Sequence, residues 1–326
     1  MNSNRRAFIS GLAALSLAGF AHGVHAQSWP AKPITLVVAF PAGGDTDVVA
    51  RIYAEKLSTL LGQPVVVQNK PGAAGVLGHS YVARAKPDGY TLAFAPNPLV
   101  ITQHVYQVSP NQSFDPVTDF SPVIQDDVIP LVMIANPESG IKTVAQLVEA
   151  AKKDPSLTFA TPGAGTTMQV VGEMLNRAAG MALTHIPYRG TAPVINDALG
   201  NQFTVGWVTS GAAMQHIQSG RLIALATSSP ERIKAMPSVP TLREEGYDIT
   251  LDAWQGLLGP AGLPEHIVST LNRHLNDIIK LPDVSARLLN MGIEPLGGTP
   301  EDFRRRITED NALYERLTKE YSIRVH

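Results

Sequence analysis

The chain of 326 residues contains no cysteine. This absence excludes a disulfide framework, a thiolate metal site and a cysteine nucleophile. No charge of one sign dominates, because 26 lysine and arginine residues stand against 28 aspartate and glutamate residues. This balance argues against a surface for nucleic acid or membrane, so we expect no nucleic-acid partner.

Motifs for nucleotides, metals and catalysis are also missing. The sequence has neither GxGxxG nor GxxxxGK[ST], which would indicate a dinucleotide or a P-loop nucleotide. Its histidines are scattered without metal-ligand spacing, and no pair of nucleophile and base stands out. We therefore expect no cofactor, no metal and no enzymatic activity.

The first 26 residues have the composition of an export signal. Arg5 and Arg6 precede a short apolar stretch at residues 11–20, and Val24-His25-Ala26 resembles a cleavage site. The apolar stretch is too short to span a bilayer comfortably. The arginine pair fits both the twin-arginine and the general secretory route. The predicted location of the mature protein is the periplasm.

The segment from Ile34 to Leu61 predicts a strand, a glycine turn and a helix. The unbroken apolar run ITLVVAF is rich in β-branched residues and is typical of a buried parallel strand. Apolar residues at helical spacing come after the turn, and the predicted helix stops at Gly62. Such a turn directs helix-start N–H groups at one place and forms a potential anion site. Asp45, Thr46 or Asp47 can cap the helix. The candidate ligand-binding residues here are Phe40, Ala42, Gly43, Gly44, Asp45, Thr46 and Asp47.

Strands and helices alternate along the rest of the chain, which predicts an α/β fold with parallel-rich sheets. The expected strands cover about 34–40, 64–67, 90–95, 157–160, 183–186, 203–208, 222–227 and 249–258. The expected helices cover about 48–61, 75–85, 143–153, 168–178, 191–199, 210–217, 264–280, 283–291 and 300–321. We expect two domains, the first from residues 27–124 and 229–326 and the second, inserted, from 125–228. Crossings near 120–136, 222–232 and 248–258 would form the hinge.

A second glycine turn, TPGAGTT, follows the strand that ends at Ala160. The candidate residues in it are Thr161, Gly163, Ala164, Gly165, Thr166 and Thr167. In an interdomain cleft the two turns would face each other across a small anion. Two facing anion sites suggest a ligand with two carboxylates, or with one carboxylate and a polar tail.

Several motifs together resemble one family across essentially the whole mature chain. FPAGGDTDVVAR, GQPVVVQNKPGAAG, KPDGYTL, PYRGTAPVINDALGNQ, SVPTLREEG and GGTPEDF are similar to the Bug (TctC-like) receptors of tripartite tricarboxylate transporters. The resemblance implies a two-domain Venus-flytrap fold of the type II periplasmic binding class. It also implies that both glycine turns face the ligand, with residues 188–190 and 207–210 nearby, which adds Arg189, Trp207 and Thr209 to the candidates.

The chain departs from the pattern of the family at three places. Asp45 stands where the family usually has a small neutral residue. It either points to solvent, caps the helix, or interacts with an ammonium or hydroxyl group of the ligand. Thr166-Thr167-Met168-Gln169 replaces a run that often contains a Ser-His pair. Trp207-Val208 replaces Phe-Asp, so Trp207 is either a flat wall for the ligand or part of the core. The lost acid favours a non-amino dicarboxylate, aromatic or aliphatic.

The resulting hypothesis is an extracytoplasmic receptor that delivers a small di- or tricarboxylate to a membrane transporter and acts as a monomer. A receptor that signals to a membrane sensor kinase is an open alternative. An enzyme on a binding-protein fold is a weaker one.

Overall fold

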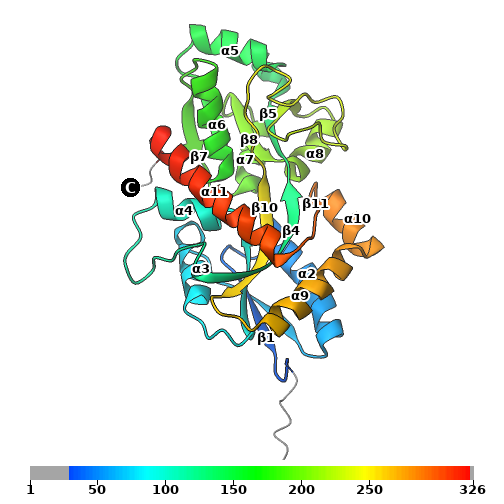
Figure 1. The fold of residues 1–326 in the computed structure, drawn as a ribbon. Coiled ribbons are helices and arrows are strands. Elements are labelled where there is room, and N and C mark those ends of the chain that lie inside the picture. The colour runs from blue at the N-terminus through cyan, green and yellow to red at the C-terminus, as the bar shows by residue number, and fades with distance from the viewer. Residues whose placement is uncertain (1–28, 324–326) are drawn as a thin grey trace, which may run out of the picture.

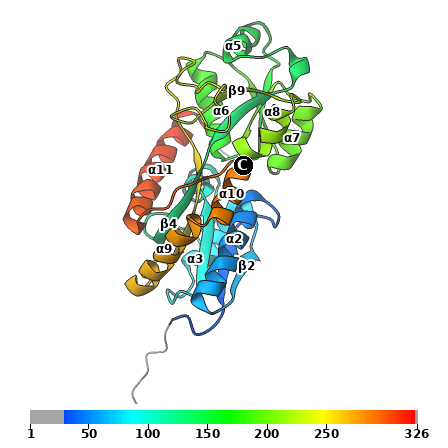
Figure 2. The same ribbon diagram turned by 90° about the vertical axis from the view of Figure 1, so that its right-hand side faces the viewer.

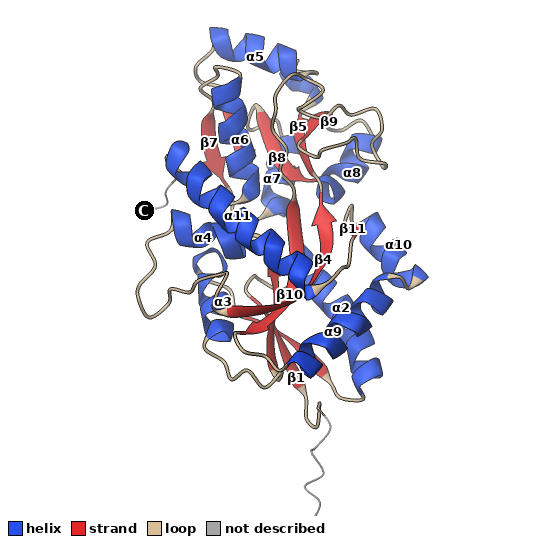
Figure 3. Ribbon diagram, in the orientation of Figure 1, coloured by secondary structure: helices blue, strands red, loops and turns tan. Residues whose placement is uncertain are grey.

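The computed structural model describes residues 29–323. The predicted signal peptide, residues 1–26, lies outside this range. The molecule is elongated and consists of two parts, each built around one mixed β-sheet with helices packed on it (Figures 1 and 3). Within residues 29–323, no helix combines the length and the apolar composition that crossing a membrane requires.

The first sheet has six strands in the order β11-β4-β10-β3-β1-β2. β1 is parallel to β2 and β3, whereas β10 is antiparallel to β3 and β4. The strands are β1 (Ile34–Val38), β2 (Val65–Asn69), β3 (Thr91–Pro96), β4 (Phe120–Ile129), β10 (Ala253–Pro260) and β11 (Glu294–Pro295).

Two groups of helices cover this sheet. α2 packs against α9, and α4 packs against α3 and α11. The helices of this part are α2 (Asp45–Leu61), α3 (Val76–Ala83), α4 (Pro98–Val105), α9 (Glu265–Ile279), α10 (Pro282–Asn290) and α11 (Pro300–Glu320), with a short 3₁₀ turn at Ala73–Gly75.

The second sheet has five strands in the order β7-β6-β8-β5-β9. β6 is parallel to β7 and β8, and β5 is antiparallel to β8 and β9. Its strands are β5 (Leu131–Ala135), β6 (Thr158–Thr161), β7 (Thr184–Pro187), β8 (Val205–Thr209) and β9 (Ile223–Thr227). Its helices are α5 (Val144–Lys153), α6 (Thr167–Ala178), α7 (Thr191–Leu199) and α8 (Ser210–Gln218), with a 3₁₀ turn at Pro137–Ser139.

The chain passes from the first sheet to the second at Pro130, between β4 and β5, and returns between β9 and β10. The Ser228 N–H of the second crossing donates to the Leu131 carbonyl just after the first (3.2 Å), and the Leu251 N–H donates back to the Ser228 carbonyl (2.9 Å). The predicted domain boundary at 124/125 falls inside β4, whose residues up to Ile129 pair in the first sheet. We propose that the chain changes domain at Pro130.

The segment after β9 differs from the expected division. Thr227 donates its N–H to the Pro240 carbonyl (2.9 Å) and accepts the N–H of Leu242 (2.8 Å). Ile233, Met236 and Val239 are buried in the hydrophobic cluster of the second sheet. Residues 229–242 therefore pack on the second sheet, although we predicted that they belong to the first domain.

The last helix, α11, touches both parts of the molecule. In Figure 1 it runs obliquely past β4 and β10 to the neighbourhood of α6. Arg177 of α6 forms a salt bridge of 3.0 Å with Glu320 near the end of α11. The view turned by 90° shows α11 at one side of both parts (Figure 2).

Two local predictions were wrong. The apolar run at residues 64–67 predicts a buried strand, but β2 is an edge strand and Val66 is 53% exposed. α4 was not predicted. Its sequence PLVITQHV is rich in β-branched residues, yet Pro98 at the first helical position and burial of Leu99, Val100 and Ile101 favour the helix.

Candidate functional site

The turn between β1 and α2 is exposed to solvent, and no side chain of the N-cap residue caps the helix that follows. Residues 41–45 are exposed, and Gly43 has a φ of +83°, which favours glycine. The N-cap is Gly44, which offers no side chain, and α2 begins at Asp45. The prediction that Asp45, Thr46 or Asp47 caps the helix is therefore wrong, because all three lie inside its first turn.

Asp47 holds this turn in place from within. It is buried, its Oδ2 accepts the Gly43 N–H (2.9 Å), and both of its oxygens accept hydrogen bonds from the Arg51 guanidinium. Asn69 at the end of β2 donates to Asp47 Oδ1 (2.9 Å) and to the Phe40 carbonyl (3.1 Å). Burial alone would raise the pKa of Asp47, but the bonds from Arg51, Gly43 and Asn69 outweigh it and lower the pKa below its ordinary value. Asp47 therefore positions the turn.

The turn between β6 and α6 repeats this construction. Gly165 has a φ of +71°, and its N–H donates to Oε1 of Gln169 (2.8 Å), again four residues ahead. Thr166 is the N-cap, and its hydroxyl accepts the Gln169 N–H and donates to the Gly163 carbonyl (2.8 Å). The amides of Gly43 and Gly165, which we expected to be available to a ligand, are thus already bonded within the protein.

The next N–H groups in both helices remain free. Among the hydrogen bonds of residues 29–323, the N–H groups of Asp45, Thr46 and Asp47 find no acceptor, and neither do those of Thr166, Thr167 and Met168. Each turn therefore presents three backbone donors at the positive end of a helix dipole. A carboxylate is well suited to accept such a group of donors.

The second turn lies against the first part of the molecule. Tyr106, just after α4, donates its hydroxyl to the Ala164 carbonyl (3.3 Å). Thr167 is buried, and its hydroxyl interacts with the Asn97 amide and with the Tyr314 hydroxyl of α11 (3.1 Å). Thr167 therefore joins the two parts of the protein, and its side chain is already occupied.

The first turn also faces the second part. Asp45 is exposed, and the side chain of Thr209 at the end of β8 lies close enough to its carboxyl to lower the pKa of that group. Desolvation by the surrounding protein raises the pKa of Asp45, and the nearby Thr209 side chain offsets part of this effect. The two turns thus lie on either side of the junction between the two sheets.

Two buried carboxyls lie in β4, near the first turn. Asp126 and Asp127 are both fully buried, and burial raises the pKa of each well above its ordinary value. Asp127 also raises the pKa of Asp126, and Asp45 raises that of Asp127. Asp126 is the extra residue of a β-bulge, because Gln255 pairs with Asp127 and Gly256 with Gln125.

The other predicted residues occupy varied positions. Arg189 is exposed and forms no ion pair within the described range, while its neighbour Gly190 donates its N–H to Pro162 of the second turn (2.7 Å). Trp207 is 1% exposed and packs in the main hydrophobic cluster, which agrees with the core interpretation. Thr161 is buried and bonded to His185 Nε2 (2.7 Å). Phe40 is half-buried beside His79.

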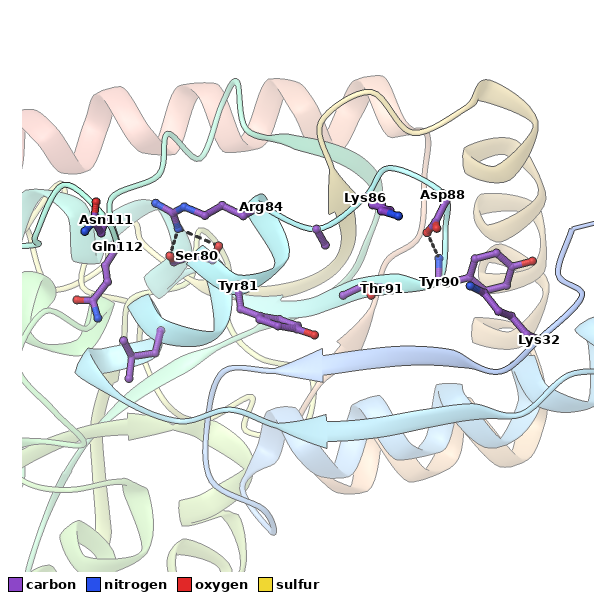
Figure 4. A pocket seen from close by; sticks show the side chains of 12 residues that line it. Lys32, Ser80, Tyr81, Arg84, Lys86, Asp88, Tyr90, Thr91, Asn111 and Gln112 are labelled. Atoms are coloured by element: carbon purple, nitrogen blue, oxygen red, sulfur yellow. Dashed lines mark hydrogen bonds between the residues drawn. The ribbon is translucent and has the colours of Figure 1, made fainter.

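A separate surface groove lies away from the junction, at the amino ends of β1 and β3 (Figure 4). Lys32, Arg84 and Lys86 line it together with Asp88, and Arg84 bonds to Ser80. This groove has no part in the junction between the domains, because the two glycine turns follow the carboxyl ends of their strands. Ligands of α/β sheets bind at those carboxyl ends.

Sequence reasoning missed several residues of the junction. Gln169 follows Gly165 at the spacing at which Asp47 follows Gly43, so the repeated pattern of a glycine and a polar side chain four residues later was a usable signal. Tyr106 and Asn97 flank α4, which was itself not predicted. Tyr314 comes from a distant helix and carried no signal in the sequence.

Comparison with known proteins supports a receptor. Residues 49–323 match the family described as tripartite tricarboxylate transporter family receptor. The chain is 34% identical over 314 residues to protein BugT of Bordetella pertussis, covering 95% of this chain and 95% of BugT.

Three solved structures have the same fold. The periplasmic binding protein BugD has a TM-score of 0.80 and 33% identity over 91% of this chain and 100% of its own. An R. palustris protein solved with adipate has a TM-score of 0.83 and 30% identity over 91% and 100%. MatC from Rhodopseudomonas palustris, with bound malate, has a TM-score of 0.77 and 27% identity over 89% and 99%.

These similarities confirm the predicted α/β periplasmic-binding-protein fold, and they confirm the resemblance drawn from the sequence motifs. The family match covers residues 49–323, so it includes the second glycine turn and begins just after the first. The chain belongs to the receptor family of the tripartite tricarboxylate transporters.

Proposed function

We propose that this protein binds a small dicarboxylate between its two domains and delivers it to the membrane components of a transporter. The observation that carries the proposal is the pair of helix N-termini at the junction, each with three backbone N–H groups that lack acceptors. Arg189 beside the second turn adds a cation without an ion pair in the described range. Export through the N-terminal signal and a periplasmic location belong to this proposal.

The energetics are consistent with reversible capture. A hydrogen bond to a charged group contributes about 1.5–3 kcal/mol. Four or five such bonds contribute about 6–15 kcal/mol. Association costs about 4–15 kcal/mol in lost freedom, so the two contributions are of similar size and the ligand can be released again.

An aliphatic ligand fits better than an aromatic one. Trp207 is buried in the core and offers no flat wall at the junction. Two neighbouring structures carry adipate and malate, both aliphatic diacids. These ligands support an aliphatic dicarboxylate for this chain.

A thermal-shift experiment with two glycine variants tests the proposal. Gly43 and Gly62 stand at opposite ends of α2, both at positive φ, and an added Cβ at either meets nothing within 4 Å. Gly43→Ala and Gly62→Ala should therefore cost a similar stability of about 1 kcal/mol. A saturating diacid should raise the melting temperature of the wild type and of Gly62→Ala, but much less that of Gly43→Ala, because its methyl group enters the ligand space.

Equal shifts in both variants would show that the ligand binds elsewhere. The absence of a shift with every diacid, measured from malate to adipate, would contradict the dicarboxylate proposal itself. A ligand at about a hundred times its Kd stabilises by about 2.7 kcal/mol, so the effect is large enough to detect.

A further inference from the structure

Asp45 places a negative charge at a site otherwise suited to anions. It is the first residue of α2 and is exposed at the junction, beside three free N–H groups. In the described range it forms no salt bridge, and the side chain of Thr209 from the opposite domain lies beside it. A ligand carboxylate that approaches this end of α2 therefore meets a like charge.

The polar groups behind Asp45 do not neutralise it. Gln255 donates its Nε2 to the Thr46 hydroxyl (3.3 Å) and its backbone N–H to Asp127 Oδ1 (2.9 Å). The Asp127 Oδ2, the Gln255 Oε1 and both Asp126 oxygens are buried without a partner. The side chains of Asp126, Asp127 and Gln255 therefore leave acceptor oxygens behind Asp45 without a partner.

The arginine of α2 is engaged elsewhere. The guanidinium of Arg51 in the same helix is bonded to Asp47 and to Asn69 Oδ1 (3.2 Å). Tyr53 of α2 is buried near Asp126 and Asp127, and its hydroxyl has no partner. The opposite side of the junction is different, because there Arg189 and the N–H groups of α6 offer donors.

The geometry points to Asp45 as a specificity-determining residue that accepts a hydrogen bond from a hydroxyl or ammonium substituent of the ligand. This inference rests on the proposed function and narrows it to dicarboxylates that carry such a donor. The carboxylates of the ligand bind to the helix N-termini, and its substituent satisfies Asp45. An unsubstituted diacid has no hydrogen-bond donor to offer to the carboxylate of Asp45, so that carboxylate gains no partner from the ligand.

Calorimetry with three acids of one carbon skeleton tests this inference. Succinate, malate and aspartate share two carboxylates and four carbons, and they differ in carrying no donor, a hydroxyl group or an ammonium group. The wild type should bind malate or aspartate about tenfold or more tightly than succinate. The order of malate and aspartate shows which donor the site prefers.

The variant Asp45→Ala should lose this preference. We expect the affinities for the substituted and unsubstituted acids to converge to within about threefold, with succinate bound no more weakly than by the wild type, because the like charge is gone. Glu265→Ala is the matched control, since Glu265 is the exposed first residue of α9. This variant also removes a negative charge from the first residue of a helix, but at a position outside the junction. It should keep the preference of the wild type for the substituted acids.

Three results would overturn the inference. The first is equal binding of succinate and the substituted acids by the wild type. The second is tighter binding of adipate than of malate and aspartate. The third is an unchanged preference in Asp45→Ala. In each case a diacid still binds, so the proposed function stands. A wild type that binds none of the four acids would contradict both this inference and the proposed function.

Discussion

The Oδ2 atom of Asp47 accepts a hydrogen bond from the N–H of Gly43 at 2.9 Å. Gln169 accepts the equivalent bond from Gly165 at 2.8 Å in the other domain. In both turns, a side chain from the start of the helix accepts the N–H of the glycine four residues earlier. This bond fixes the turn, so the free N–H groups of the following residues keep a fixed orientation. Two unrelated side chains, a carboxylate and an amide, perform the same task.

Replacing Asp47 by alanine should destabilise the protein by about 2–4 kcal/mol, because it leaves Gly43, Asn69 and Arg51 without their shared acceptor. The pKa of Asp47 is lowered in the folded protein, so its stabilising effect is present above the unfolded pKa and is lost as the pH falls through the folded value. Urea unfolding at pH 7 and pH 3 measures both effects. A variant as stable as the wild type at pH 7 would contradict the role of Asp47.

Replacing Asp126 by asparagine should have the opposite pH dependence. The folded pKa of Asp126 is raised by burial and by Asp127, so the wild type loses stability as the pH rises from the unfolded value of about 4 toward the folded one. The asparagine variant does not lose stability in this way. Its free energy of unfolding at pH 8 should exceed that of the wild type by on the order of 1 kcal/mol, and the difference should become smaller toward pH 4. Melting temperatures across pH 4–9 test this, and a gain that grows toward acid pH would refute it.

Replacing Gly165 by alanine should weaken ligand binding. Its Cβ would lie 3.3 Å from Val105 and from Tyr106, at a φ of +71°. The contact of the second turn with the first domain must then loosen. Gly180→Ala, after the other end of α6 at a φ of +64° and with nothing within 4 Å, is the control for backbone strain. Gly180→Ala should lose about 1 kcal/mol of stability and Gly165→Ala at least as much, but only Gly165→Ala should bind the diacid several-fold more weakly in calorimetry.

Replacing Arg189 by alanine should reduce diacid affinity about tenfold or more, since a charged donor beside the second turn is lost. Its exposed side chain forms no ion pair within residues 29–323, so the stability of the ligand-free protein should change by less than about 0.5 kcal/mol. Arg221→Ala, another exposed arginine of the same domain, should leave the affinity unchanged. Equal affinities of both variants would show that Arg189 does not contact the ligand.

The secondary structure could be predicted where a periodic pattern met a clear boundary signal. α2 ends before Gly62 at a φ of +64°, as its glycine indicated, and α11 begins at Pro300 after a capping box at Thr299. α4 could not be predicted, because its β-branched residues favour a strand locally and only burial between the sheet and α11 decides for a helix. The exposure of β2 could not be predicted for a related reason. A strand at the edge of a sheet can have the same apolar sequence as a strand at its centre.

The sequence by itself determined the class of fold, the family and the two glycine turns, because each depends on local patterns that a short stretch of chain carries complete. Only the tertiary structure decided which turn amides are free, that Trp207 lies in the core, that Thr167 is bonded to Asn97 and Tyr314, and that Asp45 faces Thr209 across the junction. These features depend on partners brought together from distant parts of the chain, and no local pattern of residues specifies such a partner.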